Sequence, residues 1–336
     1  MTAPPPAVRV RHLSHRFGAF EALHDVSFDV AQGEIFGFIG PNGAGKTTTI
    51  RVMATLLEPM AGRVEIDGID VTLDPGEVRR RIGYMADHAG VYDRITVREY
   101  LEFFAEAYRV PSPGVVAAVL ELTSLVKIED KIVDTMSKGM KQRLQLGRIL
   151  LHDPRVLILD EPASDLDPRA RIEIRDLLLD LRGLGKTIFL SSHILTELSD
   201  VCTSIGILER GRLVVAGPLG EIAARLEDAR AASAIGHAPV VASLSPAPPA
   251  AAPHRKLKLR VLGDPGLAAE LLRGGPGVAS AAVVLGALHV GYDGTDAAAA
   301  AIVAILVRGG VGVIGVEPER NELERIFLEV TRGDVQ

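Results

Sequence analysis

The sequence contains little of what stabilises small secreted proteins. It has one cysteine, Cys202, and no tryptophan among its 336 residues. A single thiol cannot close an internal disulfide, which excludes a disulfide-stabilised scaffold and suits a reducing compartment. The first ten residues, MTAPPPAVRV, also lack the charged start and apolar run of a secretory signal peptide.

An excess of positive charge is absent as well. Lysine and arginine together number 37 against 43 aspartates and glutamates, which gives a formal net charge of −6. Nucleic-acid-binding domains usually carry a basic surface, so we expect no nucleic-acid partner. Hydrophobic residues make up 47% of the chain, which is enough to bury a sizeable core.

Long uninterrupted apolar runs are missing too. Residues 231–252 and 274–292 carry no charged residue, but the first contains four prolines and the second opens with GGPG. A membrane-spanning helix needs about 20 strongly apolar residues. We therefore expect neither segment to span a membrane, and any membrane-embedded partner to be a separate subunit.

What is present is an alternation of short β-branched runs and helical patterns from Val8 to about residue 226. The uncharged runs IFGFIG and VLIL, the second followed directly by Asp160, are typical of central strands covered on both faces. An α/β core with an antiparallel β subdomain is predicted for a first domain, 1–228. Strands are expected at 8–13, 26–30, 34–40, 63–66, 81–85, 156–160, 187–192, 203–208 and 212–217, and helices at 45–54, 97–108, 139–151, 168–182 and 218–226.

An Ala/Pro-rich stretch, 229–253, follows this domain and has the composition of a linker. The pattern of the last part, 254–336, is strand, helix, strand, strand, helix, strand. That order predicts a small ferredoxin-like α+β domain, followed by an amphipathic helix that Asn321 caps.

A phosphate-binding pattern follows one of the central strands. GPNGAGKT matches G-x-x-x-x-G-K-[ST] between a strand and a helix, the context that the motif requires. In such a loop, backbone N–H groups point at phosphate oxygens, the lysine reaches the terminal phosphates and the hydroxyl binds Mg²⁺. The predicted binding residues are Gly40, Asn42, Gly43, Ala44, Gly45, Lys46, Thr47 and Thr48, with Lys46 also catalytic and Thr47 also a metal ligand.

Two carboxylates lie at the end of another predicted central strand, in RVLILDEP. Asp160 is predicted to hold Mg²⁺ through water, and Glu161 to orient the attacking water or accept its proton. His193, after the strand TIFLSS, can donate a hydrogen bond to the γ-phosphate. The alternatives are ordinary carboxylates at a strand end and a surface histidine in the first turn of a helix.

Taken together, these stretches resemble an ATP-binding cassette (ABC) ATPase over residues 8–226. Residues 40–47 resemble its Walker A loop, 156–161 its Walker B strand with the catalytic glutamate, and ASDLDP its D-loop. The resemblance implies a P-loop cassette with a helical signature subdomain, binding ATP and Mg²⁺. It also implies that His193 is the switch histidine and that Phe17 stacks on adenine, although an apolar strand end also explains Phe17.

MSKGMKQR resembles the family's signature motif, usually Leu-Ser-Gly-Gly-Gln. The resemblance implies that Ser137 and Gly139 contact the nucleotide of a second cassette, most simply in a homodimer. Ser137 can also be a plain helix N-cap, and Asp167 of the D-loop can cap a helix that begins at Pro168 while also serving the nucleotide site.

Five residues depart from the family's pattern. Met136, Lys138 and Met140 replace the leucine, first glycine and glutamine of the signature motif. Asp165 replaces a small residue in the D-loop. Asp87 stands where the family has a glutamine that contacts Mg²⁺ and the permease side. A carboxylate can bind Mg²⁺ directly or through water, so Asp87 is a candidate metal ligand. A solvated loop aspartate is the equal alternative.

The segments EPMAGRVEIDGIDV and LERIFLEVTRG resemble ATPases of multidrug and antibiotic export systems, which often carry a C-terminal domain. The resemblance implies an ATP hydrolase that is peripheral on the inner, cytoplasmic face of the membrane and powers a separate permease. One alternative is a soluble, non-transport ABC ATPase. The other is an ATP-gated regulatory module acting through the C-terminal domain, for which a dimer brace is the simpler role.

Overall fold

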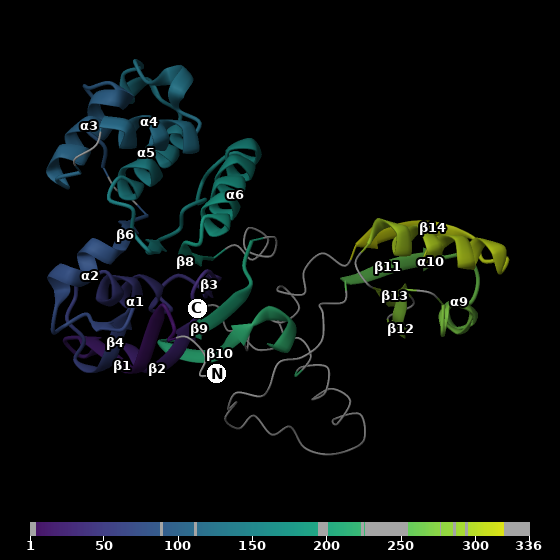
Figure 1. The fold of residues 1–336 in the computed structure, drawn as a ribbon. Coiled ribbons are helices and arrows are strands. Elements are labelled where there is room, and N and C mark those ends of the chain that lie inside the picture. Colours follow the sequence, from purple (N-terminus) through teal and green to yellow (C-terminus); the bar gives the residue numbers. More distant parts are fainter. Residues whose placement is uncertain are drawn as a thin grey trace. The chain divides into compact units, whose positions relative to one another are not determined.

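The computed structural model describes residues 5–87, 90–110, 113–193, 201–222, 225, 255–275, 277–284, 287–292 and 295–318. They belong to two compact units, and the division in sequence falls between Ile222 and Ala223 (Figure 1). The expected linker, 229–253, and the expected helix after Asn321 lie outside the described residues. The domain limits at 228 and 254 therefore stay a prediction.

A mixed sheet forms the centre of the first unit, with strand order β10-β9-β3-β8-β7-β6. Neighbours from β9 to β6 are parallel, and β10 is antiparallel to β9. The strands are β3 (Ile35–Ile39), β6 (Ile82–Met85), β7 (Val156–Leu159), β8 (Thr187–Ser192), β9 (Ser204–Glu209) and β10 (Arg212–Pro218). The carboxyl ends of parallel strands meet at one edge, so residues that follow β3, β7 and β8 gather there.

An antiparallel sheet with order β2-β1-β4-β5 packs against this centre. Its strands are β1 (Val8–Phe17), β2 (Phe20–Val30), β4 (Ala61–Ile66) and β5 (Ile69–Asp70). The ring of Phe28 lies 5.4 Å from that of Phe36 and 5.9 Å from that of Phe189, both stacked. One hydrophobic core therefore joins the two sheets, which confirms the expected α/β core with an antiparallel β subdomain.

The helices of the first unit are α1 (Lys46–Met53), α2 (Pro75–Arg81), α3 (Val97–Ala107), α4 (Pro113–Leu122), α5 (Lys138–Leu150) and α6 (Pro168–Gly183). Short 3₁₀ turns, η1 (Val126–Ile128) and η2 (Val133–Thr135), precede α5, and residues 219–222 form a helical turn. Figure 1 shows α3, α4 and α5 grouped together, with α6 beside α5.

Two of these helices were not expected from the sequence. α2 is short, and its run of arginines hides the helical period, yet Asp74 caps it by accepting the Glu77 N–H and Pro75 stands at the first position. α4 is apolar nearly all round, PGVVAAVLEL, so it lacks the amphipathic pattern that predicts a helix. The two-residue strand β5 was not expected either. The other helices and strands of the first unit lie within a few residues of their expected positions, although β1 and β2 are longer.

The second unit has the strand–helix–strand–strand–helix–strand order that the sequence predicted. Its elements are β11 (Arg255–Val261), α9 (Pro265–Leu272), β12 (Val278–Val284), β13 (Ala287–Tyr292), α10 (Asp296–Arg308) and β14 (Val313–Pro318). The antiparallel sheet has order β12-β13-β11-β14. Leu259 and Leu288 of the sheet and Leu272 and Ile302 of the helices share one core, so both helices cover the same face.

No helix within the described ranges is both long and apolar enough to cross a membrane. The uncharged stretch 274–292 instead supplies strands β12 and β13.

Candidate active site

The phosphate loop connects β3 to α1 in a conformation that requires glycine. Gly45 has φ +106°, in the left-handed region, and a Cβ there would lie 2.6 Å from the Leu23 side chain. A Cβ on Gly40 would lie 2.3 Å from the carbonyl oxygen of Leu208. Both positions are therefore packed too closely against β2 and β9 to carry a side chain. A glycine-rich loop of this kind at the start of α1 fits a phosphate chain.

The Lys46 side chain is only 6% exposed. Its ammonium donates to the carbonyl oxygens of Gly40 at 2.7 Å and Pro41 at 3.3 Å. It also lies 3.6 Å from Glu161 Oε1. Burial lowers the pKa of Lys46, and the Glu161 and Asp160 carboxylates act in the opposite direction. A concentrated positive charge is thus held inside the loop.

Asp160 and Glu161 follow β7, and one hydroxyl joins them. Ser191 of β8 donates to Asp160 Oδ1 at 2.6 Å and accepts the backbone N–H of Glu161 at 3.0 Å. Asp160 is 2% exposed, and its burial raises the pKa of the carboxyl. Hydrogen bonds with Ser191 and Thr47 lower that pKa, whereas the charges of Glu161 and Asp87 raise it.

Glu161 is held between two groups. Its backbone has φ 51°, which is uncommon for a residue other than glycine. Its Oε2 lies 2.8 Å from Nδ1 of His193, which follows β8, while its Oε1 faces Lys46. The residues predicted from separate motifs, Lys46, Glu161 and His193, therefore form one connected cluster at the carboxyl edge of the sheet.

Comparison with known proteins identifies the family. The family described as ABC transporter matches residues 23–164, and one described as an AAA domain, putative AbiEii toxin, matches 132–200. The bacitracin transport ATP-binding protein BcrA of Bacillus licheniformis is 38% identical over 219 residues, covering 65% of this chain and 72% of that protein. The chain belongs to the ATP-binding proteins of ABC transporters.

Further relatives agree with this assignment. The daunorubicin resistance ATP-binding protein DrrA3 of Streptomyces coeruleorubidus is 38% identical over 221 residues, or 65% of this chain and 70% of that protein. A solved structure of an ATP-binding subunit of an ABC transporter has 32% identity and a TM-score of 0.60, covering 66% of this chain and 93% of that one. This ABC protein accordingly binds nucleotide and hydrolyses ATP, and the sheet-edge cluster is its candidate active site.

The site also fits a magnesium ion. Asp160 supplies a buried carboxylate, and the Thr47 hydroxyl is one of its hydrogen-bond partners. In the described part of the chain no group of three His, Cys, Asp or Glu side chains is arranged to hold a metal. Mg²⁺ in nucleotide sites commonly takes one or two protein ligands together with phosphate oxygens and water. Bound there, it would neutralise phosphate charge.

The remaining predicted residues lie on separate elements. Phe17 ends β1, is 47% exposed, and its ring lies 4.7 Å from that of His15. Ser137 caps α5 by accepting the Met140 N–H at 3.3 Å. Asp167 caps α6 by accepting the backbone N–H groups of Arg169 and Ala170. The capping roles are confirmed, whereas the nucleotide contacts of these residues stay predictions.

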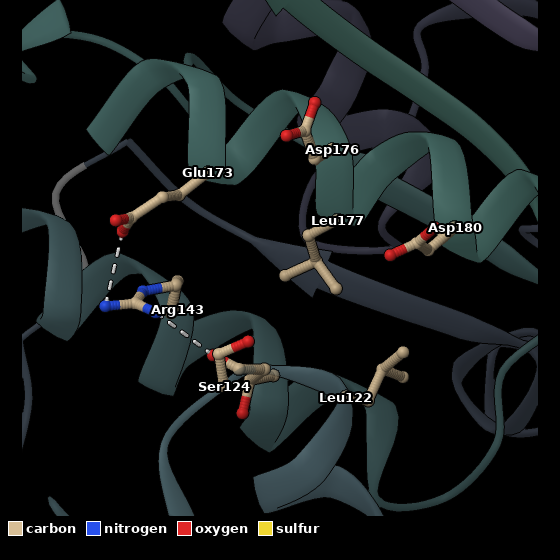
Figure 2. A pocket seen from close by; sticks show the side chains of 8 residues that line it. Leu122, Ser124, Arg143, Glu173, Asp176, Leu177 and Asp180 are labelled. Atoms are coloured by element: carbon tan, nitrogen blue, oxygen red, sulfur yellow. Dashed lines mark hydrogen bonds and ion pairs between the residues drawn. The ribbon is translucent and has the colours of Figure 1, made fainter. Parts of the chain in front are cut away.

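A pocket outside this cluster lies where α6 faces the end of α4 and the middle of α5 (Figure 2). Arg143 of α5 points across it to Glu173 of α6, with Nη2 and Oε2 3.4 Å apart. Asp176 and Asp180 continue the acidic lining along α6. None of the predicted site residues lines this pocket, so we do not assign it to the nucleotide.

Sequence reasoning missed Ser191, although the strand TIFLSS carries a signal. Its last two residues are polar, yet both are buried, so each needs a hydrogen-bond partner. The partners of Ser191 follow the neighbouring strand β7, and only the register of the sheet reveals them.

We expect Ser191→Ala to lower ATP hydrolysis about 10–100-fold, the usual cost of removing a group that orients a metal ligand. The substitution removes the hydroxyl that fixes both Asp160 and the Glu161 backbone. The concentration of Mg²⁺ needed for half activity should rise as well. The measurement is steady-state phosphate release as a function of Mg²⁺.

Ser204→Ala is the matched control, because Ser204 is also a buried serine bonded to a carboxylate, that of Glu34, at the start of β9. It should change the rate by less than about twofold. Equal losses in the two variants would mean that Ser191 acts only through general packing.

Proposed function

We propose that this chain is the ATP-hydrolysing subunit of an exporter and powers a separate membrane permease through an ATP-sandwich dimer. The proposal is supported above all by the assembly of Lys46, Asp160, Glu161 and His193 at one sheet edge. Within the first unit, Figure 1 shows the helix that Ser137 caps grouped with α3 and α4, apart from α1. The signature serine is therefore suited to a nucleotide that another chain holds.

The chemistry of the site formed by Lys46, Asp160, Glu161 and His193 of one chain follows from the contacts of these residues. Glu161 is poised to orient a water molecule whose oxygen attacks the γ-phosphorus, while the bond to the β-phosphate oxygen breaks and the water proton passes to the carboxylate. Lys46 neutralises the terminal phosphates, and His193 can stabilise the transferred group by a hydrogen bond. Phosphoryl transfer needs mainly such positioning and charge neutralisation, so these few groups are sufficient.

The dimer couples ATP to movement. ATP stabilises the closed pair only by binding it more tightly than the open pair. In the closed pair, the γ-phosphate lies between the Walker A loop of one chain and Ser137 and Gly139 of the other. Hydrolysis removes this bridge, and the pair opens. The permease is moved by that cycle.

An aromatic surface on the helical group supports a membrane-subunit contact. Tyr92 is 57% exposed and Phe103 of α3 is 50% exposed, and their rings meet edge to face at 5.5 Å. Tyr108, after the end of α3, is 40% exposed. Exposed aromatic clusters mark protein interfaces, and this one lies along the chain shortly after Asp87.

The direction of transport is supported by relatives. One is named for bacitracin transport and another for daunorubicin resistance, and both cover about two thirds of this chain. Resistance to a drug is consistent with its removal from the cell, so we favour export. A chain that serves an exporter with cytosolic ATP lies at the inner face of the membrane.

Glu161→Gln tests this function most directly. It should retain ATP binding but reduce turnover by at least about 100-fold, because only the group that activates water changes. The trapped protein should elute as a dimer in gel filtration with MgATP and as a monomer with MgADP. A monomer at saturating MgATP would contradict the sandwich.

Mixing two inactive variants tests the trans role of Ser137. Ser137→Arg should keep ATP binding in the isolated chain but block closure, whereas Lys46→Ala should lose affinity for ATP. In a mixed dimer, one composite site carries both lesions and the other carries neither. Some hydrolysis should therefore return on mixing, whereas loss of monomer ATP affinity in Ser137→Arg would indicate a site in cis.

Asp87 is proposed to couple metal occupancy to the permease. The charge of Asp87 is among the causes that raise the pKa of Asp160, which supports a position close enough to act on that carboxylate. Asp87→Ala should reduce permease-stimulated hydrolysis more than basal hydrolysis, and Asp87→Gln should restore much of it. Unchanged Mg²⁺ dependence and unchanged stimulation in Asp87→Ala would identify a solvated loop aspartate.

A further inference from the structure

Two departures from the family's motifs meet at one place in the fold. Lys138 stands in the signature motif and Asp165 in the D-loop, 27 positions further along the chain. The Lys138 ammonium donates to Asp165 Oδ2 at 3.0 Å. Each residue is unusual alone, but together they form a compensated ion pair.

The charge of Lys138 lies where a helix least favours a cation. Lys138 is the first residue of α5, next to the N-cap Ser137, and the first turn contains no acidic residue. The amino end of a helix is electrically positive and attracts anions. Lysine at this position therefore calls for a nearby anion, and in this chain Asp165 supplies it.

The pair is suited to exchange. The side chains of Lys138 and Asp165 are 53% and 73% exposed, so water and salt screen their attraction. A terminal phosphate carries more negative charge than a carboxylate and offers three acceptor oxygens. An incoming γ-phosphate at the amino end of α5 would therefore compete with Asp165 for the ammonium.

The pair is not needed to hold α5 in place, because other contacts join α5 to the segment after Glu161. Gly139 packs so closely on Ala170 that a Cβ would approach the alanine methyl to 2.7 Å. The buried side chain of Gln142 donates to the Pro162 carbonyl at 2.8 Å. The Arg143–Glu173 pair adds a third tie (Figure 2). Lys138 can thus change partners while the helix stays fixed.

We propose that Lys138 is a further phosphate-binding residue for the nucleotide of the opposite chain, and that Asp165 is its resting counter-ion. When the dimer closes, the ammonium passes from the carboxylate to the γ-phosphate. Asp165 then opposes closure, because it competes with ATP for Lys138. The inference rests on the ATP-sandwich dimer proposed above. It adds that Lys138 and Asp165 together set the ATP concentration at which the dimer closes.

The test measures the ATP concentration for half-maximal dimerisation in the Glu161→Gln full-length chain, by analytical ultracentrifugation with Mg²⁺. Four proteins are compared: the parent, Lys138→Met, Asp165→Asn and the double variant. Asparagine is chosen because Asp165 has φ 54°, a left-handed conformation that asparagine tolerates while losing the charge. Lys127→Met, at an exposed lysine in η1, controls for loss of one positive charge.

The exchange predicts shifts of opposite sign. Lys138→Met should raise the half-maximal ATP concentration about tenfold, the effect of losing one charge-assisted hydrogen bond. Asp165→Asn should lower it about threefold, because the competitor is gone. The double variant should match Lys138→Met, because without the lysine there is no ammonium for which Asp165 and ATP compete. The Lys127→Met control should match the parent.

Other outcomes overturn the proposal. Shifts in the same direction for both single variants would mean that the pair only stabilises the fold. An equal effect of Asp165→Asn with and without Lys138 would mean that Asp165 repels phosphate directly. No shift in Lys138→Met would exclude a phosphate contact. A parent chain that never dimerises with MgATP would instead overturn the sandwich itself, and this inference with it.

Discussion

The site depends on keeping opposite charges buried together at the end of a parallel sheet. Lys46 and Asp160 are almost entirely removed from water, and an unpaired buried charge costs several kcal/mol. Each is therefore satisfied on several sides: Lys46 by loop carbonyls and Glu161, Asp160 by the hydroxyls of Ser191 and Thr47. The left-handed Gly45 places Lys46 at the start of α1, and the register of β7 with β8 places Ser191 beside Asp160.

Ser137 and Asp167, which we propose to serve the nucleotide site, have a structural role as well. Ser137 and Asp167 begin α5 and α6 by accepting backbone N–H groups, which is a sufficient structural reason for both residues. The first turns of these helices still have N–H groups that lack partners within the helix. Contacts of Gly139, Gln142 and Arg143 then tie α5 to the segment that follows Glu161. Ser137 and Glu161 are consequently parts of one continuous packed body.

The sequence predicted most of this site because its chemistry is concentrated in contiguous motifs. Asp160 and Glu161 lie at the end of one apolar run, and Lys46 ends the glycine-rich loop that follows another, so their strands and their shared edge could be inferred before the structure was known. Ser191 could not be found this way, because its role depends on hydrogen bonds to the neighbouring strand. Lys138 and Asp165 were each evident as departures from the family's motifs, but nothing in their spacing in sequence indicates that they touch.

The fold was predicted to a similar extent. Helices α2 and α4 were missed because the periodicity of their sequences is weak, whereas the ferredoxin-like order was evident in the alternation of strand and helix patterns.

The position of β3 in the sheet also determines when the site can form during synthesis. β3 pairs with β8 and β9, and β9 ends only at Glu209. In contrast, β1 pairs with β2 and β4, which lie near it in the sequence. Ribosomes add about 5–20 residues per second, so β3 leaves the ribosome many seconds before its partners exist. Phe28 of the early antiparallel sheet can cover Phe36 during that interval. The cluster of Lys46, Glu161 and His193 therefore cannot be complete until β8 and His193 have left the ribosome. Until then the antiparallel sheet is available to cover β3, which is wholly apolar.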